Sequence, residues 1–209
     1  MEEKKNTMPR QLVSFVFDNS ASCSKEKLSA LMRGFRQFAA EHAEDPMLCF
    51  ELSCYDTFQP VVVKEFDGAE IAPVRAGRMP LLARTVLAAA DRLAAKAAQL
   101  RAEGETLYRP LMFILSDGFT FDDTEEAVAR LEKMEHSGAL LYLPFKLTPK
   151  LYTERLQSLD RTKHMIEIKE GCIDGFFAFV RSVLERRAAL SVDVGLKFQK
   201  SDFEGWAEL

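Results

Sequence analysis

The chain has 209 residues, of which 47% are hydrophobic and 29% are charged, so it is long enough for one globular domain with a full core. Its formal net charge of -4 and pI near 5.6 argue against a general nucleic-acid-binding protein, because such proteins are usually basic. No apolar stretch approaches the roughly 20 residues of a membrane span, and the polar start MEEKKNTMPRQ does not resemble a secretory signal. We therefore expect a cytoplasmic protein that binds neither membranes nor nucleic acids.

The N-terminal third of the sequence predicts an arm, two strands around a helix, and an edge hairpin. Residues 1–10 are polar and are expected to form a flexible arm. Residues 12–17 are apolar on both faces, which is typical of a central parallel strand. Apolar residues at helical spacing predict a helix over 25–43. A strand over 47–55 and a short strand over 61–66 then form the antiparallel hairpin.

The middle of the sequence continues the alternation of helix and strand. A stretch rich in Ala, Leu and Arg predicts a helix between Pro80 and Gly104. Residues 111–115 are a five-residue apolar run and predict a second central strand. Asp122 and Thr124 are expected to cap the helix that follows, which ends near His136. A further buried strand is expected over residues 139–145.

The C-terminal part completes the pattern with less regular elements. We expect a helix, a strand and a second helix over 150–158, 164–168 and 173–189. Residues 11–189 would then form the domain, and residues 190–209 an extension with a short pairing segment and two docked aromatic rings, Phe203 and Trp206. The whole chain therefore predicts an α/β fold. Its doubly wound, mainly parallel sheet has one antiparallel edge strand and helices on both faces.

The four cysteines do not indicate a metal site or a disulfide framework. Their spacing matches no zinc pattern, and two of them lie in a predicted strand. We expect free thiols in a reducing compartment at all four positions: Cys23, Cys49, Cys54 and Cys172.

Two acids follow the two central strands, and two hydroxyls follow the first of these acids. The first strand ends in Asp18-x-Ser20-x-Ser22, and the second ends at Asp117. The carboxyl ends of neighbouring parallel strands meet at one edge of the sheet, where open α/β folds bind their ligands. Carboxylate and hydroxyl oxygens suit a hard cation such as Mg²⁺ or Mn²⁺. The alternative for these residues is a polar helix-entry turn and, at Asp117-Gly118, a simple turn.

Three phrases together resemble the von Willebrand factor A (vWA) family. They are DNSAS at 18–22, RMPLLART at 78–85 and FILSDG at 113–118, and the resemblance extends from about Leu12 to Leu184. Spacing and the phrase YRPLMFILSDG are most similar to the bacterial TerY-like subset, associated with tellurium resistance. The resemblance implies a doubly wound fold and a metal-ion-dependent adhesion site, abbreviated MIDAS, at the positions of Asp18, Ser20, Ser22 and Asp117.

The chain departs from the family pattern beside this site. The family's metal-loop Thr corresponds to Met79, and a thioether is a poor Mg²⁺ ligand. Arg78 adds a positive charge next to it. Phe119 and Phe121 follow Asp117 in a loop, and we expect them to form a partner-binding rim with Arg78 and Met79. The alternative is that both rings fold back onto the domain.

The resemblance implies a non-catalytic protein-interaction module with a degenerate adhesion site. Its partner would be another protein, held through an acidic side chain, and its role that of a scaffold in a bacterial stress or metal-resistance system. Two alternatives stay open. One is a metal-independent interaction domain with a dead site. The other is a Mg²⁺-dependent phosphatase or phosphotransfer enzyme with Asp18 as nucleophile, although the sequence Asp18-Asn19-Ser20 lacks the Asp-x-Asp of haloacid-dehalogenase-like phosphatases.

Overall fold

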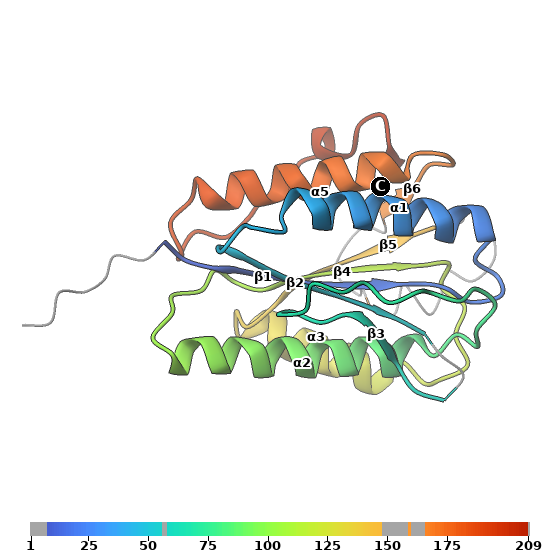
Figure 1. Cartoon of the computed structure of the whole chain (residues 1–209), viewed down its shortest axis with the longest axis horizontal. Helices are drawn as coiled ribbons and strands as arrows, with labels where there is room; N and C mark the ends of the chain where they lie inside the picture. Colours follow the sequence, from blue (N-terminus) through green and yellow to red (C-terminus); the bar gives the residue numbers. More distant parts are fainter. Residues whose placement is uncertain (1–7, 56–57, 148–158, 160–165, 209) are drawn as a thin grey trace, which may run out of the picture.

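A seven-stranded sheet lies between two layers of helices, as Figure 1 shows. The structure is a computed structural model and describes residues 8–55, 58–147, 159 and 166–208. The first seven residues of the predicted arm, the predicted helix at 150–158 and the first two residues of the predicted strand at 164–168 lie outside these ranges. No helix in the described part of the chain is long and apolar enough to cross a membrane.

The strand order is β3-β2-β1-β4-β5-β6-β7, with parallel pairing in the centre and antiparallel pairing at both edges. The strands have the following bounds: β1 Gln11–Phe17, β2 Leu48–Cys54, β3 Val61–Lys64, β4 Leu111–Ser116, β5 Leu141–Lys146, β6 Ile166–Ile168 and β7 Ala207–Glu208. The predicted α/β class, mainly parallel sheet and antiparallel edge strand β3 are confirmed. β7 adds a second antiparallel edge that the sequence pattern did not specify.

In the described part of the chain, two helices cover each face of the sheet. Figure 1 shows α1 and α5 on one side and α2 and α3 on the other. The helices have these bounds: α1 Lys25–Glu41, α2 Leu82–Ala102, α3 Glu125–His136 and α5 Ile173–Ala188, with a short 3₁₀ helix, η1, over Lys200–Phe203. Ser24 caps α1 through its side chain, which accepts a hydrogen bond from the backbone N–H of Lys27 at 3.2 Å.

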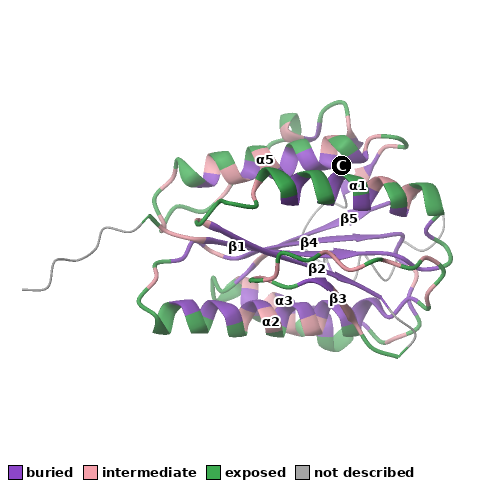
Figure 2. Cartoon of the chain, in the orientation of Figure 1, coloured by how far each residue is buried: buried purple, intermediate pink, exposed green. Residues whose placement is uncertain are grey.

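Alternation along the strands divides the core into two clusters. On β1, Val13, Phe15 and Phe17 face α1 and α5, and the intervening Leu12 and Val16 face α2. The first cluster is rich in phenylalanine rings in edge-to-face contact, whereas the second is mostly aliphatic. Purple shading in Figure 2 follows the strands and the inner faces of the helices. The buried sheet therefore fixes the positions of the loops at its carboxyl edge.

The C-terminal segment folds back onto this aromatic cluster. The Trp206 ring lies 5.4 Å from the Phe179 ring and 6.1 Å from the Phe145 ring, between centroids. Its indole N–H donates to the Asp202 carbonyl at 2.9 Å, and Asp202 forms an ion pair with Arg186 of α5 at 3.1 Å. These contacts bring the segment to β6, where β7 pairs with it.

Candidate metal site at the carboxyl edge of the sheet

Asp18 lies at the end of the central strand β1, at the point where the chain order in the sheet reverses between β2 and β4. Its backbone N–H donates to the Leu115 carbonyl at 2.9 Å, which continues the pairing of β1 with β4. The side chain is fully buried. One carboxylate oxygen, Oδ1, accepts from the Ser20 backbone at 2.8 Å, and Oδ2 accepts from the Asp117 backbone at 3.1 Å. The carboxylate therefore joins the two strand ends.

The two serines predicted as ligands lie side by side above Asp18. The Ser20 and Ser22 hydroxyl oxygens are 2.9 Å apart, with Ser20 fully buried and Ser22 exposed. Ser20 pairs with Arg78 as an isolated bridge, and the Ala21 backbone donates to the Arg78 carbonyl at 3.2 Å. This pairing brings the loop at 78–81 next to the serine loop, as the sequence resemblance implies.

Asn19 holds the same loop in place and was missed in the sequence interpretation. Its amide donates to the backbone carbonyls of Tyr55 and Arg75, at 3.1 and 2.9 Å, and its oxygen accepts from the Tyr55 N–H at 2.9 Å. It thereby ties the end of β1 to the end of β2 and to the loop before α2. An Asn at a strand end is also common in simple turns, so the sequence alone carried no signal for this role.

Asp117 lies next to Asp18 and is almost fully buried. One of its carboxylate oxygens accepts from the Phe119 backbone N–H at 2.9 Å, so the acid also orders the loop that carries the predicted rim. The Ser116 hydroxyl, between the two strand ends, donates to Asp18 at 3.1 Å. The structure thus brings together Asp18, Ser20, Ser22 and Asp117, which the sequence placed in one crevice.

The electrostatics of this crevice favour a cation. Burial, and after it repulsion from Asp117, raise the pKa of the Asp18 carboxyl from its ordinary value to about 6. Two neighbouring acids whose charges repel are stabilised by a bound positive ion. The donor set fits a hard divalent cation, because every donor is an oxygen. The described residues contain no group of three His, Cys, Asp or Glu side chains that could hold a metal. The candidate site consists instead of two acids and two serine hydroxyls.

Met79 occupies the place of the expected Thr and provides no oxygen. Its side chain is 42% exposed, and Arg78 beside it is half-buried. The hydroxyl of the buried Thr120, in the facing loop, contacts the Pro80 carbonyl at 3.1 Å and the Asp122 carboxylate, and it accepts from the Leu82 N–H at 3.0 Å. The crevice therefore contains two acids and two serine hydroxyls, and the resemblance assigns Met79 to the position of the family's further oxygen ligand.

Asp122 caps a different helix from the one predicted. The sequence assigned it, with Thr124, to the start of α3. Instead, its carboxylate accepts from the backbone N–H groups of Ala83 and Arg84 in the first turn of α2, at 3.2 and 2.8 Å. Thr124 stands at the N-cap of α3 without a side-chain cap bond, and Asp123 accepts from the Glu125 N–H at 3.0 Å. The prediction was wrong because α2 begins about 40 residues earlier in the chain, so a local pattern cannot reveal the contact.

Apolar side chains surround the crevice. Phe121 is 62% exposed, and its ring makes an edge-to-face contact with the half-buried Phe119 ring, with centroids 4.9 Å apart. The Phe121 backbone donates to the Pro80 carbonyl at 3.1 Å, so the loop that carries this aromatic pair lies next to the loop that carries Met79. Phe58, not identified from the sequence, is 82% exposed, and its carbonyl accepts from the Arg84 guanidinium at 3.1 Å. Solvent-facing rings are therefore present on the site side of α2.

The cysteine beside the serine loop is inert. Cys23 is buried, and burial, followed by repulsion from Asp18 and Asp117, raises the pKa of its thiol to about 12. All four cysteines are free, as the spacing predicted.

Comparison with known proteins identifies the fold but no relative in sequence. No family model matches the chain, and no curated protein is similar to it in sequence. Among solved structures it is similar to the N-terminal domain of TFIIH p34, at TM-score 0.58 and 13% identity, over 82% of this chain and 96% of that one.

Two further similar structures carry metals. Manganese-loaded TRAP of Plasmodium vivax matches with TM-score 0.52 and 12% identity over 75% of this chain and 64% of that chain. The mussel byssus proximal thread matrix protein 1, with a zinc-occupied MIDAS motif, matches with TM-score 0.52 and 12% identity over 87% of this chain. The present chain spans 45% of the mussel protein's length. At this identity the likeness concerns architecture alone, and it agrees with the strand order and the helix layers: the chain has a von Willebrand factor A-like fold.

Proposed function

We propose that this chain is a non-catalytic protein-interaction module. Asp18, Ser20, Ser22 and Asp117 would hold a divalent cation, Mg²⁺ or Mn²⁺, and the cation would accept a carboxylate from a partner protein. The observation that carries the proposal is the convergence of two buried acids and two hydroxyls 2.9 Å apart at one sheet edge. Manganese and zinc in two proteins of similar fold support the choice of a divalent ion.

The surroundings of the site support a protein partner. A partner that places an acidic side chain at the cation would meet Met79 and Phe121, both exposed, at its periphery. Apolar rings around a charged centre are typical of interaction surfaces, where aromatic residues are enriched. We further propose a scaffold role in a bacterial stress or metal-resistance system, as the TerY-like phrases of the sequence imply.

Metal-independent binding is the second candidate, and Met79 favours it. Without a fifth oxygen at this position the cation would rely on fewer protein ligands and more water. The same loops would then contact the partner directly through Arg78, Met79, Phe119 and Phe121.

The sequence around Asp18 supports a non-catalytic role over phosphoryl transfer. Haloacid-dehalogenase-like phosphatases carry Asp-x-Asp at this strand end, whereas this chain has Asp18-Asn19-Ser20. The hydrogen bonds that Asp18 accepts from Ser20, Ser116 and Asp117 join the two strand ends and suit an acid that organises the crevice.

A thermal melt of EDTA-stripped protein, with and without millimolar Mg²⁺ or Mn²⁺, tests the metal proposal. An ion at about 100 times its dissociation constant stabilises by about 2.7 kcal/mol. For a domain of this size that corresponds to a Tm increase of roughly 5–10 °C. Asp117→Asn should abolish the increase. Asp123→Asn, a change of an exposed acid in the same loop region, should leave it intact.

The variant Met79→Thr separates the two candidates. If the natural protein responds to the ion, the site functions with a thioether beside it. If the ion raises the Tm of Met79→Thr alone, the natural protein has lost metal binding through Met79, and this result supports metal-independent binding. If neither protein responds, the pairing of Asp18 with Asp117 does not form a metal site.

A further inference from the structure

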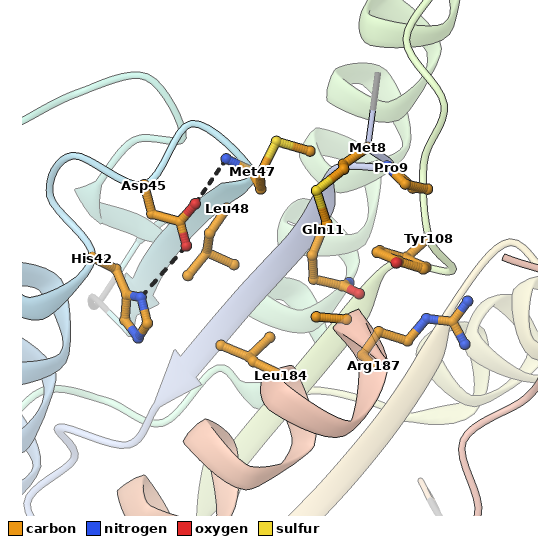
Figure 3. A pocket seen from close by; sticks show the side chains of 11 residues that line it. Met8, Pro9, Gln11, His42, Asp45, Met47, Leu48, Tyr108, Leu184 and Arg187 are labelled. Atoms are coloured by element: carbon orange, nitrogen blue, oxygen red, sulfur yellow. Dashed lines mark hydrogen bonds and ion pairs between the residues drawn. The ribbon is translucent and has the colours of Figure 1, made fainter. Parts of the chain in front are cut away.

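A cavity lies at the amino ends of β1 and β2, opposite the carboxyl edge that carries the candidate metal site. It has a volume of about 230 Å³ and lies between the start of β1, the start of β2 and the last turn of α5. β1 separates the two sites by roughly 20 Å, at about 3.3 Å per residue. Figure 3 shows Met8, Met47, Leu48 and Leu184 around it. A liquid water occupies about 30 Å³, so the cavity has room for more than a single bridging water.

A buried amide in the cavity wall has an oxygen without a partner. Gln11 is 6% exposed, and its amide nitrogen donates to the carbonyls of Leu12 and Arg109 at 2.8 and 3.2 Å. These two bonds fix which end of the amide is oxygen. Among the described residues none donates to that oxygen, Oε1. Figure 3 shows the side chain extending from β1 toward Tyr108 and Arg187. A buried acceptor without a donor costs free energy, which a ligand can recover.

Arg187 provides an unused donor in the same wall. It is 2% exposed, stacks on the Tyr108 ring at 4.3 Å, and donates through its terminal nitrogens to carbonyls of the segment at 191–194. Its Nε has no acceptor among the described residues. Asp45, the acid in the lining, instead accepts from the Met47 N–H at 2.9 Å and pairs with His42 at 3.7 Å.

The two unused atoms restrict the chemistry of an occupant. A carboxylate would suit Arg187 but would place its lone pairs against the Gln11 oxygen. An ammonium group would suit Gln11 but would be repelled by the guanidinium. A neutral carboxamide satisfies both, since its N–H donates and its carbonyl accepts. We infer that this cavity binds a small neutral molecule whose compact apolar body carries one carboxamide group.

An NMR titration of the full chain in EDTA tests this site independently of the metal site. The probes are benzamide, benzoate and toluene, which share the aromatic ring and differ in the polar group. Benzamide should bind at least about tenfold more tightly than toluene or benzoate, because each satisfied buried group is worth about that factor. Shifted backbone signals should come from the beginning of β1 and the end of α5.

Two variants and a control locate the binding. Gln11→Leu should remove the preference of benzamide over toluene. Ala188→Trp fills the cavity from an exposed position in the last turn of α5 and should abolish binding of all three probes. Gln99→Leu, on the exposed side of α2 beyond the opposite face of the sheet, should change nothing. Equal binding of benzamide and toluene to the natural protein would overturn the inference, as would benzamide binding that survives Ala188→Trp.

Discussion

At the scale of single residues, the loop next to the candidate metal site depends on Asp122. This acid connects the 118–122 loop to the first turn of α2 by accepting two backbone N–H groups that the helix itself leaves unsatisfied. A negative charge at a helix N-terminus is also favoured by the helix dipole. One side chain thus orders the predicted rim and starts a helix.

Replacing this acid should therefore cost more than a local surface change. We expect Asp122→Ala to lower the free energy of unfolding by about 1–2 kcal/mol, the usual cost of a lost N-cap with its charge. Urea unfolding measures the effect. Asp123→Ala, which removes the acceptor near the start of α3, should cost less, since it accepts a single exposed bond. Equal losses in the two variants would contradict the role assigned to Asp122.

Local patterns in the sequence predicted which polar residues meet at the carboxyl edge of the sheet, but not the residues that hold these loops in place. Asp18 and Asp117 each follow a mostly apolar strand, so the strands and hence their shared edge were predictable. Asn19 and Asp122 make their contacts with backbone groups about 36 to 56 residues away in the chain. A backbone group is present at every residue, so the sequence does not show which backbone group a side chain such as Asn19 or Asp122 will contact.

At the scale of elements, α2 is attached to the sheet by a charged pair. Glu51 of β2 is buried and accepts from Arg92 of α2 at 2.8 Å and from Ser14 of β1 at 2.7 Å. Arg92 also contacts the Ser53 hydroxyl. The strand β2 was predicted from its loose alternation, but the reason for a glutamate in a buried strand became clear only from the helix that covers it.

Removal of Arg92 should leave the buried Glu51 carboxylate without a positively charged partner. We expect Arg92→Ala to destabilise the protein by about 3 kcal/mol near neutral pH, and Arg92→Met with Glu51→Gln to cost clearly less. Burial raises the pKa of the Glu51 carboxyl, and removal of the guanidinium raises it further. The native state then binds a proton that the unfolded chain releases, so the loss grows as pH rises above the ordinary Glu value of about 4.3. Thermal melts of Arg92→Ala from pH 4.5 to 8 check this sign, and a constant deficit would contradict it.

Helices α1 and α5 approach each other closely at a glycine. A Cβ built on Gly34 would lie 2.3 Å from the Phe177 ring, which is inside the core and cannot move freely. We expect Gly34→Ala to destabilise by about 1–3 kcal/mol although it raises helix propensity. Chemical denaturation measures it, with Ser29→Ala on the exposed face of α1 as a helix-propensity control. A stabilised Gly34→Ala would show that the two helices can separate at no cost.

At the scale of the whole molecule, the C-terminal segment completes one edge of the sheet. β7 pairs with β6 because Trp206 and Phe203 anchor it to α5 and to the aromatic cluster. A two-residue strand has too few bonds to hold by itself. The sequence indicated docked rings here, but the pairing partner depends on a tertiary contact that no local pattern specifies.

Loss of this anchor should affect both stability and association. We expect Trp206→Ala to cost about 3 kcal/mol, as for other packed aromatic residues, and to release β7 from β6. An uncovered strand edge is a template for intermolecular pairing. Sedimentation velocity should then show self-association that the natural chain lacks under the same conditions. Phe58→Ala removes an aromatic ring that is 82% exposed and should change neither property.

The central position of β1 has a mechanical consequence. This strand runs from Gln11 to Phe17, directly before Asp18, and it has a parallel neighbour on each side. If a partner bound at Asp18 pulled on this strand while the rest of the domain was held, the force would act parallel to β1 and load its bonds to the neighbouring strands in shear. The backbone hydrogen bonds to β2 and β4 would share that force together instead of opening one after another. An attachment built in this way resists extraction of the strand, so it suits a linkage that has to remain intact under tension.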